Sequence, residues 1–315
     1  MSMLQLKPAL KDNLWGGTRL KTDYKMETDM DIIAEAWVLS CHKSGPSVVT
    51  NGPLAGLTLP EAIEKLGAQV LGTKGSAFEF FPILIKLIDA KDDLSIQVHP
   101  SDEYALSVEK EYGKTEMWYV VDCDPGAHLY YGFNRKIDKE EFARRIADNT
   151  ITDVLNKVEV KPGDCFFIEA GTIHAIGSGI LIAEIQQNSN TTYRVSDYGR
   201  LGADGKPREL HIDKAKEVTV LDKPAYPYGQ IAAENGVARL ASCKYFTVDK
   251  LTVDGSTAID VDGDSFASLL CLNGTVTVAN SDETITLVPG DCVFIPANSG
   301  AVTISGQADV IYSRV

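Results

Sequence analysis

Across residues 1–222, apolar residues recur at alternate positions or in short unbroken runs, a pattern typical of half-buried and fully buried β-strands. Glycine and proline residues separate these runs, so each strand is expected to end in a turn. The polar stretch 188–197 is predicted to be a loop. The predicted strands of this region lie at 34–40, 82–90, 95–99, 113–121, in three pieces across 158–175, and at 180–185.

Helical spacing of apolar residues occurs in a few segments. Residues 59–67 predict a short helix, because a proline and acidic residues suit its start and a glycine suits its end. The longest helical stretch is predicted at 137–156, where one face is apolar and the other is charged. Helical turns are also expected within 101–113 and 211–219. We interpret these segments as a small helical insertion in a mainly β protein.

A proline-rich segment, residues 222–229, precedes a C-terminal region with a different pattern. Short stretches of alternating apolar residues follow one another there, as in an all-β domain. We therefore predict two domains, residues 1–222 and 223–315. The predicted strands of the second domain lie at 245–253, 265–272, 274–279, 283–287, 292–295 and 309–312.

A Pro-Gly-Asp turn followed by an apolar run occurs twice, at 162–168 and again 127 positions later at 289–295. An internal repeat of this kind is typical of similar domains arranged in tandem. The predicted fold class is therefore mainly β, with two tandem jelly-roll-like β-barrels and a small helical insertion.

The chain carries a formal net charge of −14. Nucleic acids and anionic membranes are disfavoured as partners, because both require a basic surface. An anionic small molecule would need a local basic cluster. The longest apolar run, 80–88, is interrupted by Pro82 and Lys86 and is too short to span a membrane.

Six cysteines are scattered along the chain without a C-x-x-C motif. The sequence begins without the apolar core of a secretory signal. Several of the cysteines lie inside apolar strand-like runs. We therefore expect reduced, buried thiols in a cytoplasmic protein.

Potential metal ligands occur on three separate predicted strands. Gln97 and His99 point to the same face of one strand, because side chains alternate. Glu116 lies on the next strand, and His174 opens a later one. Two imidazoles and a carboxylate, with an amide beside them, suit Zn²⁺ or a similar divalent ion, although such ligands also bind non-haem iron. The equivalent of His174 in the second repeat is Ala301, so the site is assigned to the first domain.

Other charged residues lie near these ligands in the predicted pattern. Lys86 falls inside an apolar strand, where a charge is costly unless it is paired or functional. The alternative is a lysine whose ammonium group reaches water at the strand end. Lys114 is either a site residue or an ordinary charge at a strand start. Arg194 could simply stack on the tyrosine before it, and Glu184 lies on the strand 180–185.

Seven short motifs, in order along residues 13–210, resemble those of the type I phosphomannose isomerases, which belong to the cupin superfamily. The resemblance is to the shorter bacterial branch, and the second Pro-Gly-Asp domain is similar to the family's degenerate second cupin. The motifs are Trp15-Gly16-Gly17, Glu35-Ala36-Trp37, Leu84-Ile85-Lys86, Ser95 to Pro100, Gly113 to Glu116, Ala170 to Ala175 and Tyr193-Arg194.

The resemblance implies a function and a set of site residues. The implied reaction is the reversible isomerisation of mannose 6-phosphate and fructose 6-phosphate, with one Zn²⁺ per chain and proton transfer through an enediolate. The implied catalytic residues are Arg194, Lys114, Lys86 and Glu184. The implied zinc ligands are His99, Glu116, His174 and Gln97, although Gln97 could also line the pocket without touching the metal.

The residues alone leave several alternatives open. A lysine with a depressed pKa could transfer protons near neutral pH, so Lys86 and Lys114 are both candidates for the base, as is Glu184. Arg194 is a poor base because it is permanently charged, and it suits a developing oxyanion. Other possible functions are a different cupin enzyme, such as an Fe(II) dioxygenase, and a non-catalytic sugar-binding cupin. The expected partner is a small sugar phosphate, and the oligomeric state is left open.

Overall fold

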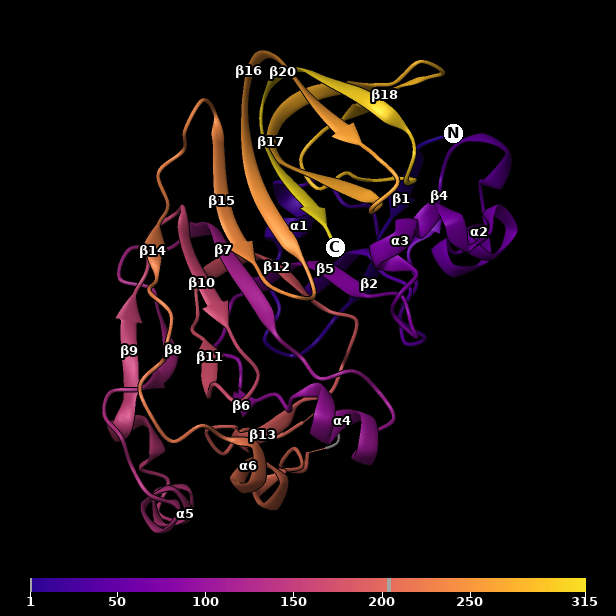
Figure 1. Cartoon of the computed structure of the whole chain (residues 1–315). Helices are drawn as coiled ribbons and strands as arrows, with labels where there is room; N and C mark the ends of the chain where they lie inside the picture. The colour runs from indigo at the N-terminus through magenta and orange to yellow at the C-terminus, as the bar shows by residue number, and fades with distance from the viewer. Residues whose placement is uncertain (1, 203–204) are drawn as a thin grey trace.

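Three antiparallel sheets form the framework of the computed structural model, which describes residues 2–202 and 205–315 (Figure 1). The seven-stranded sheet has the order β14 (Gly229–Gln230), β10 (Asp164–Ile168), β7 (Glu116–Cys123), β12 (Ile180–Gln187), β5 (Ile83–Ala90), β3 (Glu35–Leu39) and β2 (Ala9–Lys11). The five-stranded sheet has the order β13 (Tyr193–Ser196), β6 (Ile96–Val98), β11 (His174–Ile176), β8 (His128–Phe133) and β9 (Leu155–Glu159).

The third sheet has eight strands, and most of them come from the C-terminal region. Its order is β15 (Val237–Ser242), β16 (Thr247–Val261), β20 (Gly300–Arg314), β17 (Ala267–Ala279), β19 (Cys292–Ile295), β1 (Leu4–Lys7) and β4 (Val48–Val49), with β18 (Thr284–Leu287) paired to β17. The sheets are jelly-roll-like rather than fully closed barrels. The predicted mainly β fold is confirmed.

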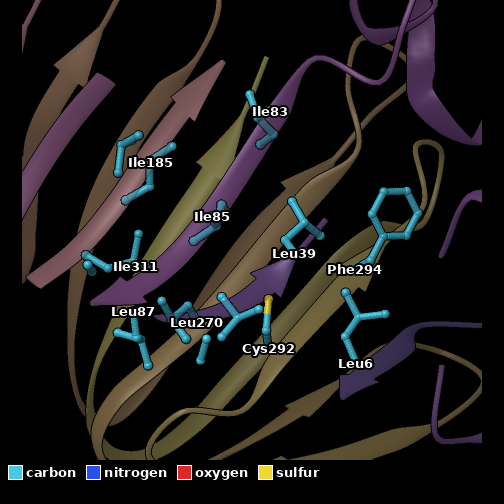
Figure 2. Close-up of a cluster of buried hydrophobic side chains, with 14 of the residues drawn as sticks. Leu6, Leu39, Ile83, Ile85, Leu87, Ile185, Leu270, Cys292, Phe294 and Ile311 are labelled. Atoms are coloured by element: carbon cyan, nitrogen blue, oxygen red, sulfur yellow. The ribbon is translucent and has the colours of Figure 1, made fainter. Parts of the chain in front are cut away.

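The seven-stranded sheet is covered on both faces, and strand alternation decides which side chains face which neighbour. Along β5, Ile83, Ile85 and Leu87 pack in the apolar cluster that includes Leu270 and Phe294 of the C-terminal sheet (Figure 2). The intervening residues point to the opposite face. There, a second apolar cluster joins this sheet to the five-stranded sheet, with Trp118, Phe166 and Ile182 from one and Leu129, Tyr131 and Ile176 from the other.

The two Pro-Gly-Asp segments form equivalent turns. Gly163 and Gly290 have φ values of +93° and +90°, which a residue with a side chain rarely adopts. Asp164 accepts a hydrogen bond from the backbone N–H of Lys161, three residues earlier. In the second turn, Asp291 accepts one from the backbone N–H of Val288. The turns lead into β10 and β19 respectively, so the sequence repeat is also a structural repeat.

Three strands of the C-terminal sheet, β16, β17 and β20, are longer than predicted. The predicted strands 265–272 and 274–279 form one strand, β17, which continues through a bulge between Cys271 and Asn273. Gly274, with φ +68°, accommodates the irregular backbone at this point. A hydrogen-bonded partner strand, β20, runs along the whole of β17, so the local glycine does not end the ladder.

The helices are α1 (Arg19–Thr22), α2 (Leu59–Leu66), α3 (Gly72–Gly75), α4 (Asp102–Val108), α5 (Lys139–Ala147) and α6 (Ile212–Val218), with 3₁₀ turns at η1 (Gly52–Leu54), η2 (Ala68–Leu71) and η3 (Ile151–Val154). The predicted helix at 59–67 is confirmed, and a capping box between Thr58 and Glu61 starts it. The prediction of one helix over 137–156 is wrong. The chain leaves α5 near Asn149, which has a positive φ, and enters β9 at Leu155.

Two further features concern the cysteines and the membrane. All six cysteines, which lie within the described residues, are free thiols. Among the described helices, none combines the length and the apolar character that crossing a membrane requires.

The N-terminal strand β1 belongs to the C-terminal sheet, where Leu6 pairs with Cys292 and packs in the apolar cluster of Figure 2. We expect Leu6→Ala to destabilise the protein by about 2–4 kcal/mol, because it leaves a cavity between the N-terminal and C-terminal parts. Denaturant unfolding would measure the change. The matched control is Lys7→Ala, since the Lys7 side chain is exposed on the same strand. Equal effects of the two substitutions would contradict this role of β1.

Candidate active site

Strand pairing places the predicted site residues opposite one another between the seven-stranded and five-stranded sheets. Glu184 of β12 lies across from Lys86 of β5. In the five-stranded sheet, Gln97 of β6 lies across from His174 of β11 on one side and from Arg194 of β13 on the other. The predicted loop at 188–197 is therefore partly wrong, because its second half is the strand β13. Backbone pairing with β6 makes this segment a strand, which its polar sequence does not indicate.

His99, Glu116 and His174 converge in a buried cluster in which their ligand atoms lie within 4.8 Å of one another. The Nε2 atoms of His99 and His174 lie 3.7 Å and 3.5 Å from the two carboxylate oxygens of Glu116. Each imidazole also lies close to a backbone carbonyl through Nδ1, at 2.9 Å from Thr191 O and 2.8 Å from Thr172 O. A neutral ring that donates from Nδ1 presents the lone pair of Nε2 to the cluster.

The chemistry of this cluster suits a divalent cation. Glu116 is fully buried, and within the described residues its Oε1 has no hydrogen-bond partner. Burial lowers the pKa of both imidazoles, as do the ammonium group of Lys114 and, for His99, the neighbouring His174, so their lone pairs stay available. Burial and the nearby Glu184 raise the pKa of Glu116. A bound divalent cation would offset the free-energy cost of burying this carboxylate. Two imidazoles with one carboxylate are a ligand set that fits Zn²⁺.

The ammonium group of Lys114 is the cation that contacts these donors in the structure. Its Nζ lies 2.6 Å from Glu116 Oε2 and 3.1 Å from His99 Nε2. Lys114 and a metal ion therefore compete for the same electron pairs. Gln97 lies at the edge of the cluster, with its amide nitrogen 3.4 Å from His174 Nε2.

A cavity of about 430 Å³ opens beside the cluster. Its lining carries more cations than carboxylates, although the chain as a whole is acidic. The local basic cluster that an anionic ligand requires is thus present. The charged residues of the lining are Lys11, Lys86, Lys114, Arg194 and Arg208, together with Glu35 and Glu184.

Lys86 is held by two carboxylates at the wall of this cavity. Its Nζ lies 3.4 Å from Glu35 Oε2 and 3.2 Å from Glu184 Oε1. Burial alone lowers the pKa of Lys86, but Glu35, Glu184 and Glu116 outweigh burial and raise it above its usual value. Lys86 is therefore held as an ammonium ion near neutral pH. It is also buried, so its head does not reach water as an ordinary strand-end lysine would.

Glu184 is fixed by the tryptophan beside it. The indole N–H of Trp118 donates to Glu184 Oε2 at 2.9 Å, while Oε1 lies 3.2 Å from Lys86 Nζ and 3.7 Å from Lys114 Nζ. Burial raises the pKa of Glu184, but these two ammonium groups more than offset burial and hold it below its usual range. Glu184 is therefore ionised at neutral pH.

Arg194 lines the cavity and is held by neutral oxygen atoms. Its guanidinium group donates to the backbone carbonyl of Glu209 at 2.7 Å and to Ser95 Oγ at 3.3 Å. Tyr193 instead has the ammonium group of Lys214 over its ring, at 5.5 Å from the centroid. Consecutive residues on β13 face opposite sides, so stacking on Tyr193 does not explain Arg194.

Two cationic residues of the cavity were missed by the sequence reasoning, Lys11 and Arg208. Lys11 donates to the backbone carbonyl of Ser44 at 2.6 Å, and Arg208 donates to Asp197 at 2.7 Å. Neither belongs to a recognisable motif, and only tertiary contacts bring them to the cavity. Glu35 and Trp37 also line the cavity, and the motif that contains them does not by itself indicate a role.

Two family profiles match the chain. The type I phosphomannose isomerase catalytic domain matches residues 3–121, and the mannose-6-phosphate isomerase cupin domain matches residues 237–315. The mannose-6-phosphate isomerase ManA of Bacillus subtilis is 38% identical over 321 residues, which cover 99% of this chain and 98% of that protein. This chain belongs to the type I phosphomannose isomerase family. It is therefore an aldose–ketose isomerase, as the resemblance in the sequence implied.

Other members of the type I phosphomannose isomerase family match this chain over nearly its full length. A mannose-6-phosphate isomerase of Streptococcus mutans is 37% identical over 314 residues, which cover 99% of this chain and 98% of that protein. A crystal structure of the mannose 6-phosphate isomerase from Bacillus subtilis superposes with a TM-score of 0.90 at 35% identity, covering all of both chains. The predicted cupin fold is thereby confirmed.

We expect His99→Ala to reduce the divalent metal retained by the protein at least tenfold, because it removes one of three strong donors. The measurement is the metal content per chain, by elemental mass spectrometry, after loading with Zn²⁺ and desalting. The matched control is His128→Ala, which removes an imidazole of the same domain that lies outside the cluster. Unchanged retention by His99→Ala would contradict the assigned metal site.

Proposed function

We propose that this chain interconverts mannose 6-phosphate and fructose 6-phosphate with Zn²⁺ as its cofactor. The observation that carries the proposal is the cationic cavity beside the His99–Glu116–His174 cluster in a chain similar to mannose-6-phosphate isomerases over its whole length. A sugar phosphate fits this pairing, because its hydroxyl oxygens suit a hard cation and its phosphate suits basic side chains.

The ligands that would hold the zinc ion are His99, Glu116 and His174, and we include Gln97 as a weaker fourth donor. Once bound, the ion supplies a Lewis acid that stabilises negative charge on the sugar oxygens. The two imidazoles donate hydrogen bonds from Nδ1 to backbone carbonyls, and these bonds fix the rings before any ligand binds.

We assign the cationic side chains of the cavity to two negative charges of the substrate, the developing oxyanion and the phosphate. We assign Arg194 to the oxyanion that develops when carbon 2 loses its proton, because it is permanently charged and lies directly across from Gln97. Arg208 and Lys11 are assigned to the phosphate, since they line the same cavity. Lys86 remains charged and holds Glu184 in place.

We assign the proton transfer to Glu184, with Lys114 as its neighbour. The Glu184 carboxylate is ionised, so it can accept a proton, and its Oε1 lies 3.2 Å from Lys86 Nζ. The carboxylate takes the proton from carbon 2, and the C–H bonding electrons pass into the enediolate. It then returns the proton to carbon 1, while the hydroxyl proton on O2 passes to O1, so that the aldehyde at carbon 1 becomes a ketone at carbon 2. Lys114 lies 3.7 Å from Glu184 and compensates its charge.

We also propose that residues 1–222 form the catalytic domain and 223–315 the degenerate cupin domain. The cupin family match within 237–315 supports the boundary, although β1 extends from the first domain into the sheet of the second. A cytoplasmic location is proposed from the free cysteines, which suit a reducing compartment.

A coupled assay on mannose 6-phosphate tests the proposal. We expect turnover by the Zn²⁺-loaded protein, loss of turnover after treatment with a chelator, and recovery when Zn²⁺ is restored. Recovery with Fe²⁺ alone, accompanied by oxygen consumption, would instead indicate a cupin oxygenase. Absence of turnover in a protein that retains one Zn²⁺ per chain would contradict the proposed reaction.

The substitution Glu184→Gln is expected to lower kcat by about 10²–10⁴-fold and to change KM by less than about fivefold, because it removes the proton acceptor and keeps the shape. Steady-state kinetics with mannose 6-phosphate provide the measurement. The matched control is Glu35→Gln, which also removes a carboxylate from Lys86 but lies next to neither Lys114 nor Glu116. We expect it to cost less than about tenfold. Equal losses in kcat would indicate that both carboxylates only hold Lys86.

A further inference from the structure

A carboxylate just after His99, that of Asp102, has no part in the site described above. Asp102 begins α4 and does not line the cavity beside the metal cluster. Its Oδ1 accepts hydrogen bonds from the backbone N–H of Gly113 and from Gln187 Nε2, both at 2.8 Å. Its Oδ2 accepts a hydrogen bond from the hydroxyl group of Tyr245 at 2.7 Å. A carboxylate with three donors holds the three segments that supply them in fixed relative positions.

The first donor, Gly113, opens the segment that carries Lys114 and Glu116. Its backbone approaches the turn at Asp102 so closely that a side chain would not fit, because a Cβ on Gly113 would lie 2.4 Å from the backbone nitrogen of Asp102. The backbone N–H of Lys114 also donates to the carbonyl of Pro100 at 3.0 Å. The start of this segment is thus fixed to the turn that follows His99.

The second donor, Gln187, uses both ends of its side-chain amide. Nε2 donates to Asp102, and Oε1 accepts a hydrogen bond from the backbone N–H of Thr115 at 2.9 Å. The backbone N–H of Gln187 also donates to the carbonyl of Thr115 at 3.0 Å. Gln187 ends β12, three residues after Glu184. Asp102 therefore connects the segment of Lys114 to the strand of Glu184.

The segment that leads to His174 meets the same group of residues. The backbone N–H of Ala170 lies 3.3 Å from Thr115 Oγ1, and the backbone N–H of Gly171 donates to the carbonyl of His99 at 2.8 Å. The segments of all three metal ligands are therefore tied together beside the cluster. We call this region the ligand junction, and it comprises residues 99–102, 113–115, 170–171 and Gln187.

The third donor, Tyr245, comes from the C-terminal domain. It lies between β15 and β16, within the residues that match the cupin domain of the family. Its side chain is buried, and its bond to Asp102 joins positions 143 residues apart. Among the described residues, the lining of the cavity beside the metal cluster comes only from positions 11 to 208. The C-terminal domain thus reaches the site through the ligand junction and not through the cavity wall.

We propose that Asp102 is a positioning residue of the active site and that Tyr245 anchors it to the C-terminal domain. Asp102 acts through the ligand junction, which keeps Lys114 Nζ at 2.6 Å from Glu116. A displacement of about 1 Å at a reacting group can cost about 100-fold in rate. The effect on turnover rests on the proposed function, whereas the effect on metal affinity does not depend on the identity of the sugar phosphate.

Asp102→Ala tests the ligand junction in the Zn²⁺-loaded protein. We expect the Kd for Zn²⁺ to rise about tenfold and kcat to fall about tenfold, because the metal ligands and Lys114 lose a shared support. KM should change by less than about threefold, since the cations assigned to the phosphate lie outside the junction. Competition with a chromophoric chelator measures the Kd, and steady-state kinetics with mannose 6-phosphate measure kcat and KM.

Two variants of the same helix turn accompany Asp102→Ala. Asp102→Asn keeps a side-chain oxygen that accepts from Gly113, so it should restore the Kd and kcat to within about threefold of the wild-type values. The matched control is Glu103→Ala, which removes an exposed carboxylate from the first turn of α4. It should leave both quantities unchanged.

Tyr245→Phe tests the contribution of the C-terminal domain, because it removes only the hydroxyl group. We expect it to weaken Zn²⁺ binding and to lower kcat, each by about three- to fivefold. The matched control is Tyr24→Phe. Tyr24 is also buried in the same apolar cluster, and its hydroxyl group donates to the carbonyl of Leu272 at 3.2 Å. Its loss should lower the temperature of unfolding by a similar amount and leave Zn²⁺ affinity and kcat unchanged.

Unchanged Zn²⁺ affinity in folded Asp102→Ala would overturn the positioning role, as would equal losses in Asp102→Ala and Asp102→Asn. Equal effects of Tyr245→Phe and Tyr24→Phe on Zn²⁺ affinity would overturn the role of the C-terminal domain. If Asp102→Ala fails to fold, Asp102→Asn and the two tyrosine variants decide. Absence of turnover in the Zn²⁺-loaded wild-type protein would instead contradict the proposed function, and the Zn²⁺ affinities would then decide the role of Asp102.

Discussion

Four charged side chains share the buried space beside the seven-stranded sheet, and the rest of the site depends on how they compensate one another. Lys86, Lys114, Glu116 and Glu184 are each at most 5% exposed. Lys114 lies between the two carboxylates, at 2.6 Å and 3.7 Å, and Lys86 contacts Glu184 at 3.2 Å. Buried charges persist only when they are paired, so removing one member leaves another uncompensated. The four side chains therefore act as one electrostatic unit.

The covering of the seven-stranded sheet on both faces makes this unit possible. Alternate residues of β5 pack against the C-terminal sheet, so the strand is anchored by apolar contacts that do not involve the site (Figure 2). The opposite face of β5 carries Lys86, which lies among charged and polar neighbours. The C-terminal cupin domain, which has Ala301 at the position that the sequence repeat aligns with His174, thus supports the seven-stranded sheet with apolar surface.

The charge of the cavity beside the metal cluster is opposite to that of the chain as a whole. The chain is acidic overall, yet this cavity is lined by cationic side chains from β2, β5, β13 and the segments near β7 and β13. An anion entering it moves against the field of the whole protein and toward a local cluster.

Local sequence determined much of the fold and the core of the candidate site. Strand alternation placed Gln97 and His99 on one face, and the structure brings His99 together with Glu116 and His174, because side-chain direction along a strand is a local property. The Pro-Gly-Asp turns were equally predictable, since their φ values require glycine. Tertiary structure decided what depends on distant partners: the strand β13 in a polar stretch, the arrival of Arg208 at the cavity, and the raised pKa of Lys86. Pairing and burial between remote segments set these features, and no local pattern encodes them.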